Sequence, residues 1–129
     1  PFLCSQRIRN VVMTDAEILG AEPPENAVIY RDGGAVGMLL PITLSVWEVH
    51  CGAAPAMRGK ASLAAFRRLL AEFWIDHPEV KELIGVMKSE HLCARYNAAR
   101  LGFERVNTTP ITWPDGTVRE TADYRMKRP

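Results

Sequence analysis

The stretch from Val46 to Trp74 constrains the fold more than any other part of the chain. It begins as an extended segment over Val46–Cys51, passes through a breaker over 52–55 and the basic turn Arg58-Gly59-Lys60, and then becomes helical. Apolar residues recur there at steps of three and four, the spacing of one helix face: Leu63, Phe66, Leu70, Phe73 and Trp74. A strand that turns through a basic, glycine-containing loop into a helix presents free backbone N–H groups and a positive dipole end. The stretch therefore predicts an anion site, most often one for phosphate.

The neighbouring segments predict a single α/β domain over residues 1–129, with a mixed, mostly antiparallel sheet flanked by helices. Residues 27–31 and 35–40 flank Asp32-Gly33-Gly34, a hairpin signal because glycine tolerates the positive φ of such turns. Residues 43–51 supply a third strand. Residues 82–87 form a short buried strand after the central helix, so the strand, helix, strand succession indicates a parallel crossover.

The ends of the chain predict shorter elements. Ser89 is expected to cap a second helix that runs through Arg100, and Gly102 lies beyond its end. We expect the apolar side of this helix to consist of Leu92, Tyr96 and Ala99. A last pair of strands over 103–107 and 117–126 follows, while residues 5–18 predict one or two short helices that end at Gly20.

Composition narrows the class of protein. With 47% hydrophobic and 24% charged residues among 129, the chain is of the globular kind and long enough to bury a core. Its net charge of +1 gives no electrostatic footprint for nucleic acid or an acidic membrane, and no apolar run reaches the length of a membrane span. Cys4, Cys51 and Cys93 form an odd, widely spread set, which favours a reducing cytoplasm.

From residue 27 to 126 the chain resembles the GNAT family of N-acetyltransferases. In that family a strand leads through a proline or similar breaker into a Q/R-x-x-G-x-G/A loop, which opens a helix and holds the pyrophosphate of acetyl-CoA. The segment from Pro55 to Leu63 resembles this loop, with Arg58 at the Q/R position and Ala61 and Leu63 at the two small-residue positions. An alternative register places Ala56, Gly59 and Ala61 on the motif.

A second signature of the family, N-x-x-A-x-x-x-Y-x-x-x-G-F, falls on the second predicted helix. The residues at its defined positions are His91, Ala94, Ala98, Gly102 and Phe103. The tyrosine that protonates the departing CoA thiolate in many relatives is thus replaced by Ala98, and Tyr96 lies about 200° away around the helix. The chain also resembles short GNAT-like proteins of bacteriophages, which carry similar Arg-Gly-Lys loops.

The resemblance implies an enzyme in which a primary amine of a small molecule or protein attacks the thioester of acetyl-CoA directly. It implies a monomer or homodimer without a metal. Glu48 and His50 alternate on one face of their strand, and either could relay the proton of the amine. The implied cofactor contacts are backbone groups at the strand end, the basic loop and the start of the second helix: Cys51, Gly52, Ala53, Arg58, Gly59, Lys60, Ala61, Ser62 and His91.

Other interpretations of these residues stay open. Arg58-Gly59-Lys60 would also suit a solvated turn, and Glu48 with His50 a solvent-facing strand pair. Counting back from Arg58, better-known relatives carry their catalytic residue near Trp47 and Val49. A GNAT-shaped protein that has lost catalysis and serves as a binding or assembly module is the alternative function.

Two rival chemistries fit the sequence less well. A nucleotide P-loop, G-x-x-x-x-G-K-[ST], would need glycine at Ala54 and a hydroxyl at Ala61. A zinc site made of His50, Cys51, His91 and Cys93 would need strand neighbours that point to opposite faces to converge.

Overall fold

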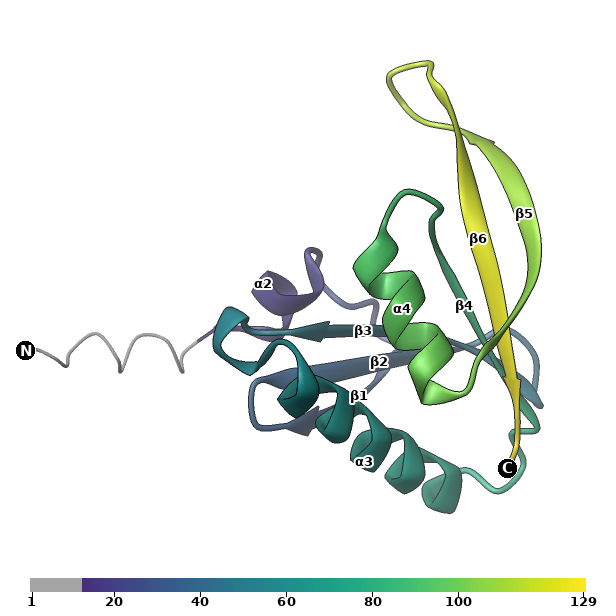
Figure 1. Cartoon of the computed structure of the whole chain (residues 1–129). Helices are drawn as coiled ribbons and strands as arrows, with labels where there is room; N and C mark the ends of the chain where they lie inside the picture. Colours follow the sequence, from purple (N-terminus) through teal and green to yellow (C-terminus); the bar gives the residue numbers. More distant parts are fainter. Residues whose placement is uncertain (1–12) are drawn as a thin grey trace, which may run out of the picture.

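A computed structural model describes residues 13–129, which form a six-stranded sheet in the order β1-β2-β3-β4-β6-β5 (Figure 1). Only β3 and β4 run parallel, as the crossover pattern predicts. The strands are β1 (Val28–Asp32), β2 (Ala35–Pro41), β3 (Val46–Ala53), β4 (Glu82–Lys88), β5 (Glu104–Thr112) and β6 (Val118–Lys127). The helices are α2 (Asp15–Leu19), the 3-10 turn η1 (Pro55–Met57), α3 (Lys60–Asp76) and α4 (Leu92–Leu101). The predicted mixed sheet with flanking helices is confirmed.

The N-terminal prediction can be compared only in part. Of the one or two helices expected over residues 5–18, the described portion contains α2, which Gly20 ends in the left-handed conformation with φ of 85°. Residues 5–12 lie outside the described residues. Thr14 caps α2 through a capping box with Glu17, in which each side chain bonds the backbone of the other.

Two consecutive residues of β1 show which face of the sheet each helix covers. The Tyr30 hydroxyl donates to Asp76 Oδ2 of α3 at 2.7 Å, whereas Arg31 Nε donates to Asp15 Oδ1 of α2 at 3.0 Å. Because neighbouring residues of a strand point to opposite faces, α3 and α2 lie on opposite faces of the sheet. We call these the α3 face and the α2 face. α4 contacts α3, β4 and β5.

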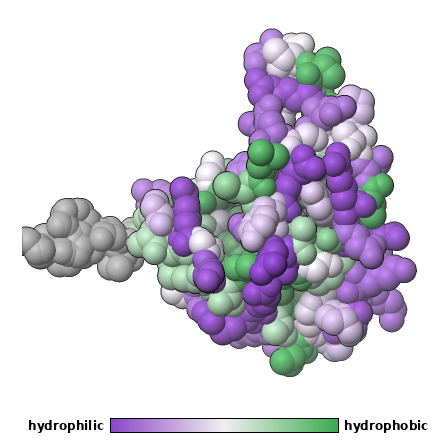
Figure 2. Space-filling model, viewed as in Figure 1, coloured by the Kyte–Doolittle hydropathy of each residue, from purple (hydrophilic) through white to green (hydrophobic). Residues whose placement is uncertain are grey.

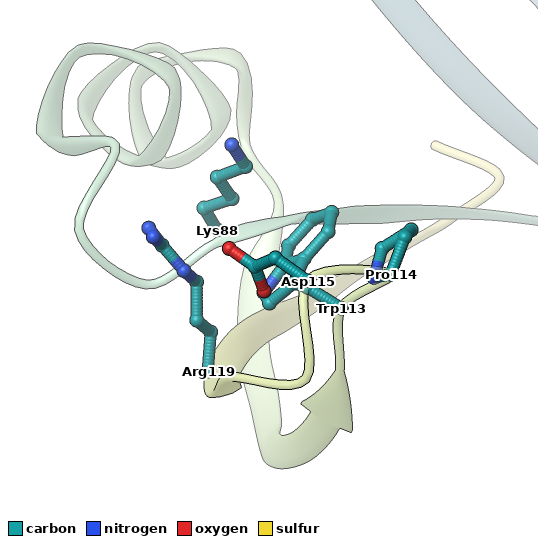
Figure 3. A pocket seen from close by; sticks show the side chains of 5 residues that line it. All are labelled: Lys88, Trp113, Pro114, Asp115 and Arg119. Atoms are coloured by element: carbon teal, nitrogen blue, oxygen red, sulfur yellow. The ribbon is translucent and has the colours of Figure 1, made fainter.

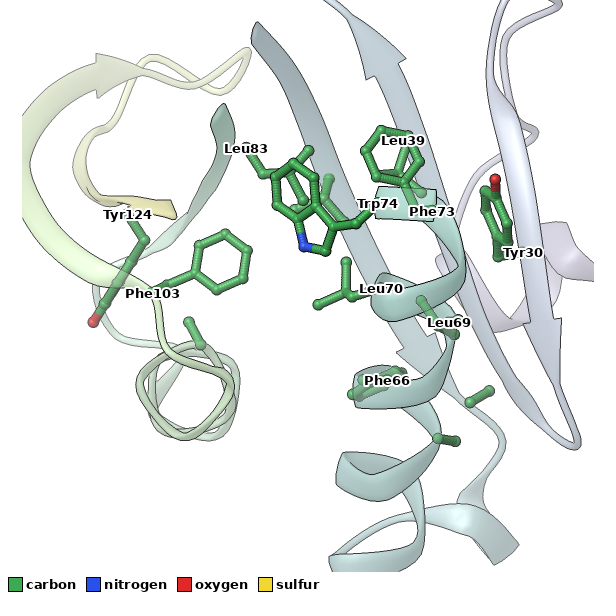
Figure 4. Packing of buried hydrophobic residues seen from close by; sticks show 14 of the residues in the cluster. Tyr30, Leu39, Phe66, Leu69, Leu70, Phe73, Trp74, Leu83, Phe103 and Tyr124 are labelled. Atoms are coloured by element: carbon green, nitrogen blue, oxygen red, sulfur yellow. The ribbon is translucent and has the colours of Figure 1, made fainter. Parts of the chain in front are cut away.

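The core lies between the sheet and the helices α3 and α4, and Phe73 is fully buried in it (Figure 4). The rings of Tyr30, Trp47 and Trp74 meet Phe73 edge-on at centroid distances of 6.0, 5.4 and 5.7 Å. Edge-to-face contacts of this kind stabilise aromatic clusters beyond the area they bury. The apolar face predicted for this helix is confirmed, since all five of its residues are buried: Leu63, Phe66, Leu70, Phe73 and Trp74. No helix of residues 13–129 has the length and apolarity that a bilayer crossing demands.

The prediction for α4 was wrong in two respects. His91 rather than Ser89 caps the helix, and its Nδ1 accepts a bond from the Ala94 N–H at 3.3 Å. The expected apolar side is exposed, with Leu92 at 69% and Tyr96 at 61%, and Ala99 is exposed as well. Ala98 faces the core instead, because a small side chain lets the helix approach Phe103 and Tyr124 closely.

We expect Gly37 to be required for the close packing of α3 against the sheet. A Cβ at Gly37 would lie 2.6 Å from Leu69 Cδ1, and Leu69 is only 1% exposed and has little room to move. Gly37→Ala should therefore lower the free energy of unfolding by about 1–3 kcal/mol, measured by urea denaturation. Gly85→Ala is the matched control, because a Cβ there would come no closer than 3.8 Å to another residue. Equal stability of the two variants would contradict this account.

Tyr30 should make the protein sensitive to alkali. Burial, together with the bond to Asp76, raises the pKa of Tyr30. An unfolded tyrosine has a pKa of about 10 and loses its proton first, so the free energy of unfolding should fall as pH rises above about 10. Tyr30→Phe should make this decline shallower in urea denaturation. Tyr96→Phe, at a side chain that is 61% exposed, should keep the slope of the wild type, and identical slopes in all three proteins would refute the assignment.

Candidate functional site

The sheet opens between β3 and β4. The two strands pair only over Val46–Glu48 and Glu82–Ile84, although β3 continues to Ala53 and β4 to Lys88. Figure 1 shows β4 and the β5–β6 hairpin rising away from β3. An opening with unpaired strand edges on both sides therefore lies beyond residue 48.

Hydrogen bonds at the two ends of β3 show which backbone groups face this opening. The Ile42 N–H donates to the Val46 carbonyl at 2.9 Å, and the Ala54 N–H donates to the Gly34 carbonyl at 2.8 Å. Because backbone direction alternates along a strand, His50 and Gly52 also bond to β2. Cys51 and Ala53 direct their N–H and C=O groups toward the opening. Gly52, the third residue expected to offer its N–H group here, turns it to β2 instead.

The first turn of α3 leaves its backbone donors free. Gly59 precedes the helix with φ of 94°, and no side chain of the described chain caps it. The first intrahelical bond runs from the Leu63 N–H to the Gly59 carbonyl at 3.2 Å, and the Ser62 hydroxyl donates to the same carbonyl at 2.9 Å. The N–H groups of Lys60, Ala61 and Ser62 are thus without a partner within residues 13–129. By contrast, side chains cap both α2 and α4.

The basic loop before α3 is open to solvent. Arg58, Gly59, Lys60 and Ala61 are exposed, and within the part of the chain that the structure describes neither cation has an ion-pair partner within 4.0 Å. Leu63 points into the core with 9% exposure, so it does not crowd the mouth of the loop. Two cations and a positive helix end therefore coincide at one exposed turn, which is the arrangement of an anion site.

Glu48 and His50 form a pair on the α2 face. His50 Nε2 lies 3.0 Å from Glu48 Oε2, and the side chains are 38% and 24% exposed, respectively. If Nε2 carries the proton and donates to the carboxylate, Nδ1 is left to accept a proton. Trp47 and Val49 point the other way, into the core, and have no access to a substrate on this face.

Helix α2 borders this pair. A Cβ at Gly52 would lie 2.7 Å from the Ile18 carbonyl oxygen, so only glycine allows α2 to approach β3 so closely. Gly52 lies two residues beyond His50 on the same face of the strand, so this contact places the end of α2 next to the Glu48–His50 pair. His91, which was expected near the cofactor, is exposed at the start of α4 and uses its Nδ1 as the cap.

A separate hollow of about 290 Å³ lies at the tip of the β5–β6 hairpin. Figure 3 shows Lys88, Asp115 and Arg119 beside the Trp113 indole, and Lys88 Nζ lies 4.7 Å above that ring. Arg119 is paired with Glu90 at 2.8 Å. In Figure 2 the hairpin is mainly hydrophilic, with hydrophobic residues near its tip, where Val118 is 68% exposed. The sequence did not predict this hollow.

Metal ligation is not suggested by the described residues. Within 13–129, no three His, Cys, Asp or Glu side chains gather as a metal ion would require. Cys51 and Cys93 are exposed free thiols.

Amide hydrogen exchange should report the opening directly. We expect the N–H groups of Cys51 and Ala53 to exchange much faster than those of His50 and Gly52, because only the latter bond to β2. Exchange followed by NMR on the labelled full chain would measure all four. Uniform protection from residue 50 to 53 would mean that the strand edge is covered.

Comparisons with solved structures identify the architecture as the GNAT fold. IAA acetyltransferase from Bacillus cereus superposes with a TM-score of 0.66 at 15% identity, over 92% of this chain and 95% of that one. A GNAT-family acetyltransferase from Bacillus anthracis gives 0.62 at 9% identity, over 72% and 57%. Microcin C7 self-immunity acetyltransferase MccE, solved with acetyl-CoA and AMP, gives 0.65 at 14%, over 81% and 62%. The chain thus spans less than two-thirds of the latter two proteins. Neither models of protein families nor curated proteins match this sequence.

Proposed function

We propose that this protein binds acetyl-CoA and transfers its acetyl group to a primary amine. The observation that carries the proposal is the exposed start of α3, which no side chain of residues 13–129 caps and which follows the strand that borders the opening. The GNAT fold supports it, because the solved structures with this fold include an acetyltransferase complexed with acetyl-CoA.

The cofactor would use backbone groups along its whole length. The N–H groups of residues 60–62 would bind the diphosphate, with Arg58 and Lys60 adding positive charge. The pantetheine arm would lie in the opening and pair with the backbone of Cys51 and Ala53 as an added strand does. The thioester would then reach β3 beside Glu48 and His50.

The chemistry requires a free amine and a stabilised oxyanion. An alkyl ammonium has a pKa of about 10.4, so a base must take one proton before the nitrogen attacks the thioester carbonyl. His50 Nδ1 would accept that proton while Glu48 stabilises the imidazolium. A backbone N–H of the opening would stabilise the tetrahedral oxyanion. Collapse of this intermediate breaks the C–S bond, and the second proton of the nitrogen passes through water to the departing sulfur, so that the amide and the CoA thiol are released.

The leaving thiolate is where this chain departs from the family pattern. Ala98 occupies the position at which many GNAT enzymes carry a tyrosine acid, and its side chain is 8% exposed against the core. Tyr96 is 61% exposed and lies on another side of the helix. This observation favours a second candidate function, a protein that binds acetyl-CoA without transferring the acetyl group.

The cofactor site can be tested at its cations. Arg58→Ala and Lys60→Ala should each weaken acetyl-CoA binding by about tenfold in calorimetric titration, the loss expected for one charge-assisted contact. Lys81→Ala is the control variant. It removes an exposed cation that directly precedes β4, and it should leave the affinity for acetyl-CoA unchanged. S-acetylpantetheine lacks the diphosphate, so its binding should not respond to any of the three substitutions. Loss of affinity for both ligands would point to misfolding.

The catalytic pair can be tested by turnover. With any amine that the wild type acetylates, His50→Ala should lower kcat by about 10² to 10⁴, the usual contribution of a general base. Glu48→Gln should have a smaller effect and should shift the lower limb of the pH–rate profile. Acetyl-CoA affinity should be preserved in both variants. Undiminished rates would remove the pair from the mechanism, and binding without turnover in the wild type would favour the second candidate function.

A further inference from the structure

Strand register places a second carboxylate on the α2 face, across the opening from Glu48 and His50. Glu48 pairs with Ile84 of β4, and Val86, two residues further along the same face, pairs with Asp123 of β6. Paired residues share a face and alternate residues keep it. Asp123 thus lies on the face that carries the proposed base, and a strip made of Ile84 and Val86 separates the two carboxylates.

Asp123 is held in one orientation. The Thr109 hydroxyl donates to its Oδ2 at 2.8 Å, and the Thr121 hydroxyl donates to its Oδ1 at 3.0 Å. Thr121 is only 5% exposed, which limits its freedom to reorient. Both oxygens therefore have neutral donors, and the carboxylate is presented in a defined direction.

Within the part of the chain that the structure describes, no neighbour neutralises the charge of Asp123. Among residues 13–129 no cation lies within 4.0 Å of its carboxylate. Two cations on the same face lie near other groups, since Arg125 Nη1 lies 3.9 Å from Glu82 Oε2 and Lys88 Nζ lies over the Trp113 ring. A carboxylate that is oriented but unpaired is suited to bind a cation from outside the chain.

The surface between the two carboxylates is apolar. Val86 is 37% exposed and Ile84 is partly buried. Adjacent paired strands lie about 4.8 Å apart, so β3 and β6 are roughly 10 Å apart where β3 pairs with β4, and farther apart beyond Glu48, where Asp123 lies. A separation of this size calls for a long alkyl chain that carries an amine at each end.

We propose that the acceptor is a small alkyl diamine and that Asp123 determines this specificity. One nitrogen reacts beside Glu48 and His50, the methylene groups lie over Ile84 and Val86, and the second nitrogen stays protonated and binds Asp123. The proposal rests on the acetyl transfer proposed above and assigns its acceptor. Asp123 touches the distant end of the substrate, so it affects binding more than the chemical step.

The test compares two amines of equal chain length, 1-aminohexane and 1,6-diaminohexane, as acceptors for the full chain with acetyl-CoA. In the wild type the diamine should have a kcat/KM about 10- to 100-fold higher, the range of one desolvated ion pair. Asp123→Asn keeps the shape but removes the charge; its Oδ1 accepts the bond of one threonine hydroxyl, and its amide NH2 group donates to the other hydroxyl oxygen. This variant should reduce the preference for the diamine to about twofold, because the KM of the diamine rises. The kcat of the diamine, and the kcat and KM of the monoamine, should not change.

Two further variants separate charge from folding. Glu120→Gln removes one charge from β6 on the opposite face and should keep the preference of the wild type. Thr109→Val leaves Asp123 charged but loosely held, so it should give an intermediate preference. Equal kcat/KM for both amines in the wild type, or an equal loss for both in Asp123→Asn, would overturn the proposal.

Binding of the diamine without turnover distinguishes this proposal from the proposed function. The Val86 methyl resonances should shift on titration with 1,6-diaminohexane in the wild type and should shift much less in Asp123→Asn. Such binding in a protein that transfers no acetyl group would support the diamine site and reject only the enzymatic function. Turnover of 1-aminohexane without any Asp123-dependent binding of the diamine would reject only the specificity.

Discussion

The structure depends on an interruption in the hydrogen-bond ladder between β3 and β4. On its other edge, β3 is paired with β2 over nearly its whole length, from Trp47 to Ala53. β4 is likewise paired with β6 along its whole length, from Glu82 to Lys88. The sheet therefore has two halves, β1-β2-β3 and β4-β6-β5, which meet over three residue pairs. The backbone groups on the unpaired edges that face the opening must therefore be satisfied by water or a ligand.

The same interruption explains why the start of α3 matters. Helix α3 follows β3 after a short connection over residues 54–59, which contains η1, so it begins beyond the unpaired part of β3. Its first turn, which no side chain of residues 13–129 caps, thus follows the amides of Cys51 and Ala53 that face the opening. A molecule with an extended polar arm and an anionic end could bind both without any change in the backbone. The helix is fixed in this place by Gly37, which lets Leu69 contact β2.

Local patterns predicted most of the fold. The hairpin at Gly33, the buried face of α3 and the parallel crossover all follow from periodicity and turn residues within short windows, and all are present. The face of α4 was wrong because Leu92 and Tyr96 are more hydrophobic than Ala98, whereas the sheet admits only the smaller side chain. The direction of the Gly52 backbone and the position of Asp123 depend on strand pairing between distant segments. Alternation along β6 could have indicated the face of Asp123, but not which residues lie opposite.

The periodicity of β3 assigns separate tasks to its residues. The side chains of Trp47 and Val49 pack in the core. Cys51 and Ala53 continue the same alternation along the strand, and their backbone groups face the opening. Glu48 and His50, in the other phase, bond to β2 through their backbone and present their side chains on the α2 face. A cofactor bound through backbone groups and an acceptor bound through side chains would thus meet at one strand without competing for the same atoms. A shift of one residue in the β2–β3 register would exchange the two sets, bury Glu48 and His50, and abolish both sites together.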